Sequence, residues 1–306
     1  MAYTFINAPA SLAAVISGII SAATAQGWAH NAPSGWDNLQ LTSGGATYHF
    51  NLQNTTLASY GPAIAAYGAT AYNSAAAITA QTNCSPAAYA SNYVAGSFLG
   101  AYIFSGTTYV HTVVQTTAGV FFHLHMGVLE NGTGAQYIQT AERPITTASS
   151  YFEWVNYPTY FNNPFSYNGG QGSQTYSRNV IGSIIDGAWA WKYIGASSPG
   201  RLILPCVEGL CDDMFARSQK PYNGVTPLLP MPVFAERSLG NVYSYLGTPP
   251  SMRYVNMYQH NPGDVITLGS DTWMLFPMVA KNATQNVYES VTPNVGTYFY
   301  GLALKQ

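Results

Sequence analysis

The stretch Ser11–Gly27, which reads SLAAVISGIISAATAQG, decides the fold because it carries the strongest helical pattern in the chain. Its apolar residues recur every three or four positions, which is the spacing of one face of an α-helix. Ser11 can accept a hydrogen bond from a backbone N–H group of the first turn, and Gly27 can take the left-handed conformation that ends a helix. The stretch therefore predicts one amphipathic helix over residues 11–27, with an apolar face formed by Leu12, Val15, Ile16, Ile19, Ile20 and Ala23.

The rest of the chain consists mostly of short runs rich in Thr, Tyr, Val and Phe that are broken by Gly, Pro and Asn. This pattern is typical of strands joined by turns. We therefore expect a mainly β protein with antiparallel β-sandwich-like sheets, one N-terminal amphipathic helix packed against them, and long loops. Residues 1–306 are expected to form a single β-rich domain, and the proline-rich region 196–232 is the place where it could subdivide.

Charged residues are rare: 7 % of the chain is Asp, Glu, Lys or Arg, whereas about 25 % is typical of globular proteins. Aromatic residues make up 14 %, so the low charge does not indicate a disordered chain. Protein interfaces are enriched in Tyr and Trp and depleted in Lys and Glu. The composition therefore favours a subunit whose faces are largely covered by neighbours.

Charge and hydropathy argue against two classes of partner. The net charge of −2 gives no field that would attract nucleic acid or anionic lipid. No run reaches the roughly 18 consecutive apolar residues of a membrane helix. The apolar N-terminal region lacks the basic residues of a signal peptide, since the first Lys or Arg is Arg143. We therefore expect no nucleic acid, no membrane, and assembly inside the producing cell.

The cysteines are too few and too widely spaced for a zinc site or a disulfide framework. Cys206 and Cys211 could close a short loop, while Cys84 stands alone. Reduced thiols are the expected state.

Several segments predict particular β elements. Residues 37–42 and 46–52 predict a hairpin over Gly44-Gly45, and residues 53–92 predict long loops or a short helix near 75–80. Three successive strands, 97–104, 107–116 and 120–129, predict an antiparallel meander. Residues 130–183 are expected to be an irregular contact loop, followed by a strand over 184–194. Later strands are expected at 233–236, 242–246, 253–259, 265–268, 272–279 and 297–304.

Histidines form the sharpest chemical constellation in the sequence. A three-residue hairpin loop at 117–119 pairs Thr116 with Val120, which places His111 opposite His125 and puts His123 on the same face. Three imidazoles with an open position would suit zinc or iron. A two-residue turn would instead move His111 to the other face. Histidines without a metal on an interface-facing strand remain the commoner case, so no cofactor is expected and iron or zinc is the alternative.

Signatures of catalysis are weak. The adjacent acidic pair Asp212-Asp213 lies in a turn region, and a glycosidase pair would have to be assembled from the distant residues Glu142, Glu153 and Asp186. The sequence contains no G-x-S-x-G motif, phosphate-binding loop or dinucleotide fingerprint. The prediction is therefore a protein that is not an enzyme.

An aromatic loop over residues 151–170 supplies the other candidate site. Flat rings beside amide groups can bind a sugar by stacking and hydrogen bonding, but the same residues also make good subunit contacts. The contact interpretation is favoured, with a glycan as the alternative. The residues concerned are Trp154, Tyr157, Tyr160, Phe161, Asn162 and Tyr167.

Several segments together resemble a group of tailed-bacteriophage virion proteins of about this length. They are the opening helix with Gly27-Trp28, LTSGGATYHF (41–50), FFHLHMGV (121–128), NYPTYFNNPFSYNGG (156–170), ITLGSDTWMLFPMVAKN (266–282) and YFYGLALKQ (298–306). The H-x-H motif at 123–125 is also similar to one by which some trimeric phage spikes share an iron ion. The shared segments consist of packing and turn residues, so the resemblance implies no catalytic residues.

The resemblance implies a structural subunit of the virion, in the tail, baseplate or neck. Its expected partners are other virion proteins and copies of itself. Three alternatives remain open: a receptor- or glycan-binding module at the tail tip that contacts a host surface glycan, a capsid decoration protein, and a glycan-degrading enzyme.

Overall fold

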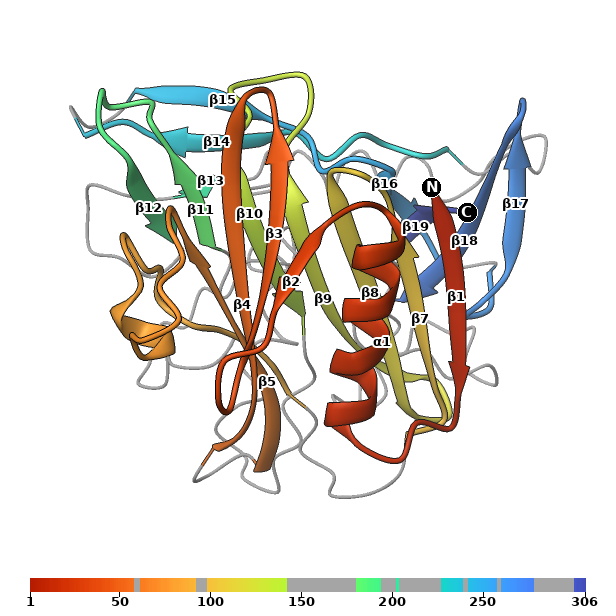
Figure 1. Cartoon of the computed structure of the whole chain (residues 1–306). Helices are drawn as coiled ribbons and strands as arrows, with labels where there is room; N and C mark the ends of the chain where they lie inside the picture. The colour runs from red at the N-terminus through yellow and green to blue at the C-terminus, as the bar shows by residue number, and fades with distance from the viewer. Residues whose placement is uncertain are drawn as a thin grey trace, which may run out of the picture.

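The computed structural model describes residues 1–57, 61–91, 98–141, 180–193, 202–203, 227–238, 242–257, 260–277 and 300–306. These residues form four antiparallel sheets and one α-helix, which confirms the predicted mainly-β, sandwich-like architecture (Figure 1). No helix among them is both long and apolar enough to cross a membrane.

The predicted helix is present as α1 (Leu12–Ala25). The Ser11 hydroxyl caps it by accepting a hydrogen bond from the Ala14 backbone N–H at 3.2 Å. Gly27, just beyond the helix, has a φ of 88°, the left-handed conformation expected of a residue that ends a helix. The apolar face is buried at Leu12, Val15, Ile16, Ile19, Ala22 and Ala23.

A seven-stranded antiparallel sheet forms the central layer, in the order β1-β7-β8-β9-β10-β11-β12. It contains the predicted meander, and its first strand, β1, was not anticipated from the sequence. Residues 136–141 and 180–183, which were predicted to belong to an irregular loop, are strands of this sheet. The predicted strand over 184–194 is wrong in its bounds, because residues 184–189 form the turn between two strands. The strands are β1 (Ala2–Asn7), β7 (Gly100–Ser105), β8 (Tyr109–Thr117), β9 (Val120–Val128), β10 (Gln136–Ala141), β11 (Val180–Ser183) and β12 (Ala190–Tyr193).

A five-stranded sheet follows α1 in the chain, in the order β2-β3-β4-β5-β6. The hairpin over Gly44-Gly45 is confirmed, and both glycines have positive φ, as the tight turn requires. Residues 53–92 are not mainly loops: they complete β4 and form β5 and β6, with a 3-10 turn at Ile78–Ala80. The strands are β2 (Ala29–Asn31), β3 (Asp37–Ser43), β4 (Ala46–Leu57), β5 (Gly61–Ala69) and β6 (Ala88–Ser91).

Two smaller sheets come from the C-terminal part of the chain. Most of their strands lie within a few residues of the predicted positions. The three-stranded sheet contains β13 (Leu202–Ile203), β14 (Val233–Glu236) and β15 (Tyr243–Gly247). The four-stranded sheet has the order β16-β19-β18-β17, with β16 (Met252–Asn256), β17 (Val265–Leu268), β18 (Asp271–Pro277) and β19 (Tyr300–Lys305).

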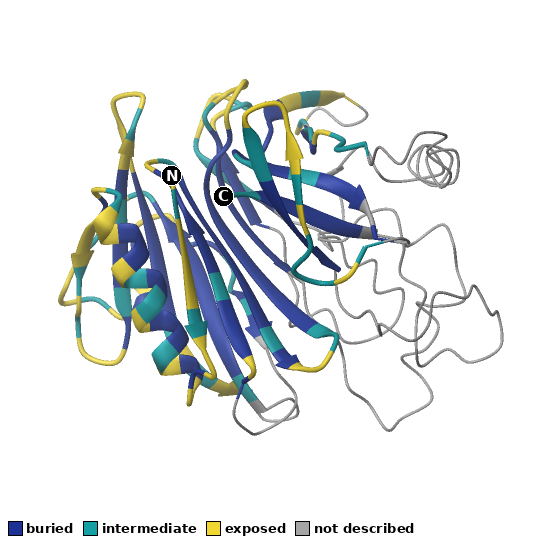
Figure 2. Ribbon diagram, turned by 90° about the vertical axis from the view of Figure 1, so that its right-hand side faces the viewer, coloured by how far each residue is buried: buried dark blue, intermediate teal, exposed yellow. Residues whose placement is uncertain are grey.

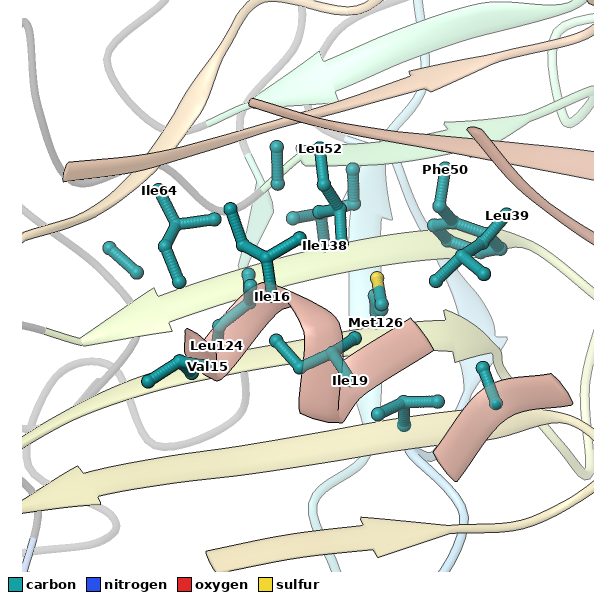
Figure 3. Close-up of a cluster of buried hydrophobic side chains, with 14 of the residues drawn as sticks. Val15, Ile16, Ile19, Leu39, Phe50, Leu52, Ile64, Leu124, Met126 and Ile138 are labelled. Carbon is teal, nitrogen blue, oxygen red and sulfur yellow. The ribbon is translucent and has the colours of Figure 1, made fainter. Parts of the chain in front are cut away.

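Each face of the central sheet is covered by a separate apolar layer (Figures 1 and 2). On one face, α1 and the five-stranded sheet pack against Leu124, Met126 and Ile138 of the central strands (Figure 3). On the other face, the C-terminal sheets pack against Phe104, Val113, Phe121 and Tyr137 through Leu246, Met252, Phe276 and Leu302. The C-terminal sheets therefore share a core with the central sheet.

The helix is expected to be essential for closing the first layer. Ile19 is fully buried between the two sheets, so Ile19→Ala should lower the free energy of unfolding by about 2–5 kcal/mol. Urea denaturation monitored by tryptophan fluorescence measures this change. The exposed Ser21 on the same helix is the matched control, and Ser21→Ala should change stability by less than about 0.5 kcal/mol. Equal effects of the two substitutions would contradict the packing described for α1.

Candidate functional site

The three histidines of the β8–β9 hairpin lie on one face of the central sheet, as the sequence predicts. His111 pairs with His125 and Val113 with His123. The turn is tighter than expected, because Thr117 pairs with Val120, but a bulge between Gln115 and Thr117 restores the predicted register.

This face meets the C-terminal sheets, and all three histidines are fully buried. His123 lies against β18, where its Nε2 is 3.0 Å from the Pro277 carbonyl oxygen. Because a carbonyl oxygen only accepts, Nε2 carries the proton and donates to it. In neutral His123 the Nδ1 atom is then an acceptor, and His125 Nε2, at 3.3 Å, donates to it. The hydrogen bonds thus fix one tautomer for each of these two histidines.

His111, on β8, reaches past β9 toward strand β10, two strands away in the central sheet. Its Nε2 lies 2.8 Å from the Tyr137 hydroxyl, and its ring packs edge-on against that of His125, with centroids 5.0 Å apart. Gln139 stands opposite His125 in the β9–β10 pairing and is also fully buried. Neither polar atom of the Gln139 amide has a hydrogen-bond partner among the described residues, nor does His111 Nδ1. The cluster is therefore a group of polar side chains buried in the apolar interface between the central sheet and the C-terminal sheets.

Burial keeps these histidines neutral. Loss of hydration lowers the pKa of His111 to about 3 and that of His123 to about 4, although the hydrogen bond to Pro277 acts in the opposite direction for His123. The pKa of His125 is lowered well below its ordinary value by burial first, and then by His111 and His123. Burial also raises the pKa of the Tyr137 hydroxyl well above 10.

The geometry does not support the alternative of a metal ion shared by the three histidines. Both ring nitrogens of His123 are engaged in hydrogen bonds, and His111 Nε2 points to Tyr137. Within the part of the chain that the structure describes, no group of three or more His, Cys, Asp or Glu side chains is placed to hold a metal ion. The arrangement instead joins the central sheet to the C-terminal layer through the bond from His123 to Pro277.

Asp186, one of the predicted glycosidase carboxylates, lies in an ion-pair network at the turn between β11 and β12. Its carboxylate accepts hydrogen bonds from Lys192 Nζ at 2.6 Å and from the Ser238 hydroxyl at 2.7 Å, and Arg237 Nε is 3.6 Å away. The hydrogen bonds from Lys192 and Ser238 hold the pKa of this carboxyl well below its usual range. A general acid needs a raised pKa, so Asp186 does not suit that role. It links β11 and β12 to the end of β14.

The remaining predicted candidates lie outside the described residues. They are the aromatic loop residues Trp154, Tyr157, Tyr160, Phe161, Asn162 and Tyr167, the acidic residues Glu142, Glu153, Asp212 and Asp213, and the cysteines Cys206 and Cys211. Sequence reasoning missed Arg237 and Ser238 because 52 residues separate Ser238 from Asp186. It also missed Lys192, six residues from Asp186, because the turn between β11 and β12 was predicted as a continuous strand. It also missed Gln139, whose place beside His125 follows only from the β9–β10 register.

No protein-family model matches the chain, and no curated protein matches it either.

The buried histidines predict acid sensitivity. Their folded-state pKa values lie below the unfolded value of about 6.5, so the unfolded chain binds protons first as the pH falls. Their contribution to stability is therefore complete above about pH 6.5 and is lost as the pH falls below it. Each histidine adds up to about 1.4 kcal/mol per pH unit to this loss, down to its own folded pKa. Urea titrations from pH 7.5 to 4.5 measure the slope.

The variant His111→Phe isolates one of these groups. The variant loses the hydrogen bond to Tyr137, which lowers stability by the same amount at every pH. It also removes one group that takes up a proton in the unfolded chain, which changes how stability depends on pH. The slope of stability against pH between 6 and 4.5 should therefore fall by up to about 1.4 kcal/mol per pH unit. A slope identical to that of the wild type would show that His111 does not titrate as its burial requires.

Breaking the Asp186–Lys192 ion pair should lower stability more than breaking an exposed ion pair does. Asp186→Asn leaves the Lys192 ammonium, whose side chain is 5 % exposed, without its charged partner. Because Asp186 is itself partly hydrated, the loss of stability should be about 2–3 kcal/mol, somewhat below that of a fully buried pair. The matched control is Asp271→Asn, which breaks the exposed Lys305–Asp271 pair and should cost less than about 1 kcal/mol. Denaturant titration compares the two variants, and equal losses would contradict the distinction.

Proposed function

We propose that the protein is a structural subunit of a bacteriophage virion, in the tail, baseplate or neck, whose task is to form contacts with copies of itself and with other virion proteins. The observation that carries the proposal is the placement of exposed apolar side chains on strands at sheet edges. Tyr3 and Phe5 of β1 and Tyr243 and Tyr245 of β15 are all exposed. Sheet edges and exposed aromatic residues are common sites of association between chains.

Two further features support this role. The charged residues number 10 basic and 12 acidic in 306, so the surface presents few ions that would have to be desolvated at a contact. The described candidates for chemistry are buried or tied into networks: His111, His123 and His125 are inaccessible to a substrate, and Asp186 is held by Lys192 and Ser238. The proposed role needs no catalytic step and no cofactor. The resemblance of the sequence to tailed-phage virion proteins points the same way.

The proposal is tested by particle composition. Phage particles produced by the strain that carries the gene are purified by density gradient, and their proteins are quantified by mass spectrometry. The protein should be present in a fixed number of several copies per particle and should resist removal by moderate salt, because few ion pairs would hold it. Its absence from intact particles would overturn the proposal.

Antibody labelling separates the remaining alternatives. Gold-labelled antibody should mark the tail, baseplate or neck, whereas labelling over the head would favour a decoration protein. Antibody that blocks host adsorption by intact particles would favour the receptor- or glycan-binding module.

A further inference from the structure

Strand β1 forms one edge of the central sheet. It stands at the end of the strand order, and its pairing with β7 is unbroken from Ala2 opposite Ser105 to Asn7 opposite Gly100. Among the described residues, no other strand pairs with it. Its central residues Tyr3, Thr4 and Phe5 are all exposed, and Figure 2 shows exposed positions along the strand that follows the N-terminus. The free edge therefore offers a row of backbone hydrogen-bonding groups.

Among the described residues, most of the other edge strands are shorter or carry a charge, and β15, with five uncharged residues, comes nearest to β1. Strand β2 has three residues and includes His30, which pairs with Asp37, and β6 and β17 have four residues each. Strand β12 also has four residues and includes Lys192. Such features protect a sheet edge from pairing with another chain. Strand β1 has six residues, AYTFIN, without a charge, a proline or a bulge, so it lacks this protection.

The exposed aromatic residues of β1 already belong to an aromatic layer. Tyr3, 36 % exposed, packs on Phe104 with ring centroids 5.0 Å apart, and Phe5, 45 % exposed, packs on Tyr102 at 4.8 Å. One side of each ring is thus covered by β7. The remaining exposed surface lies on the strand that forms the open edge of the sheet.

We propose that β1 of one copy pairs with β1 of a second copy, antiparallel, about a two-fold axis at Thr4. This register places Tyr3 opposite Phe5 of the second copy, and Phe5 opposite Tyr3 of the second copy. Each aromatic row then runs through four strands: Phe104, Tyr3, Phe5 of the second copy and Tyr102 of the second copy. The central sheets of the two copies become one continuous sheet. The inference rests on the proposed function, since a virion brings many copies of its subunits close together.

The absence of charge on β1 favours a second copy of β1 as its partner, and the small area that would be buried indicates a weak contact. A second β1 brings no charge to the edge, so no like charges meet and no ion must be desolvated. A fully buried aromatic side chain covers about 150–250 Å². The exposed fractions of Tyr3 and Phe5 in two copies therefore supply on the order of 300 Å², below the roughly 1,200 Å² of a stable interface. The pair should form at high protein concentration and in an assembly, not as a permanent dimer.

Charged variants at the two-fold axis test the register. Thr4 is exposed, so Thr4→Lys and Thr4→Glu should leave the monomer folded. Each variant alone places like charges opposite one another, which should weaken dimer formation by up to about fivefold in sedimentation velocity. An equimolar mixture of the two variants should restore dimers, because Lys then faces Glu. The matched control is Thr267→Lys on the edge strand β17, which should dimerise as the wild type does.

Every outcome bears on the inference. The inference would be overturned by a wild-type chain that stays monomeric at high concentration, or by Thr4→Lys dimers as strong as those of the wild type. It would also be overturned by loss of dimers in Thr267→Lys, or by a mixture of the two Thr4 variants that fails to restore dimers. Open-ended oligomers would also overturn it, because a two-fold pair closes on itself. Particle composition is measured separately. If the protein is present in particles but β1 does not pair, the proposed function stands and the pairing fails. If the protein forms dimers through β1 but is absent from particles, the pairing stands and the proposed function fails.

Discussion

Burial of the central sheet on both faces is the constraint on which the rest of the structure depends. Strands β8 and β9 are almost entirely buried over their length, so each face needs its own apolar cover. The helix and the five-stranded sheet supply one cover, and the C-terminal sheets supply the other (Figure 1). The two covers come from opposite ends of the chain: α1 belongs to the first, and the second is completed only by β19.

Because the central sheet is covered on both faces, the three histidines must form their hydrogen bonds with protein groups. A polar side chain on either face of such a sheet meets another layer and not solvent, so its hydrogen bonds must come from protein groups. His123 finds the Pro277 carbonyl, 154 residues away, and thereby connects the central sheet to the C-terminal cover. The cost is that none of the three imidazoles can take up a proton without disturbing the interface. The cluster joins layers and is closed to substrates.

The sequence predicts those features that local geometry determines. The helix follows from its period and its caps, and the pairing of His111 with His125 follows from a loop that contains Gly119. Strand β5 was missed because Ala63–Ala66 are buried at every position, which removes the alternation that identifies a strand. The contacts of Ser238 with Asp186 and of Pro277 with His123 join segments 52 and 154 residues apart, and no periodicity in one segment reports them.

Electron cryo-microscopy of the assembled phage particle tests the central claim most directly. We expect repeated copies of this chain, each with its central sheet between two covering layers, in the tail, baseplate or neck. Apolar contacts at the sheet edges should join the copies. The contrary result is a particle whose fully interpreted map contains no density for this chain.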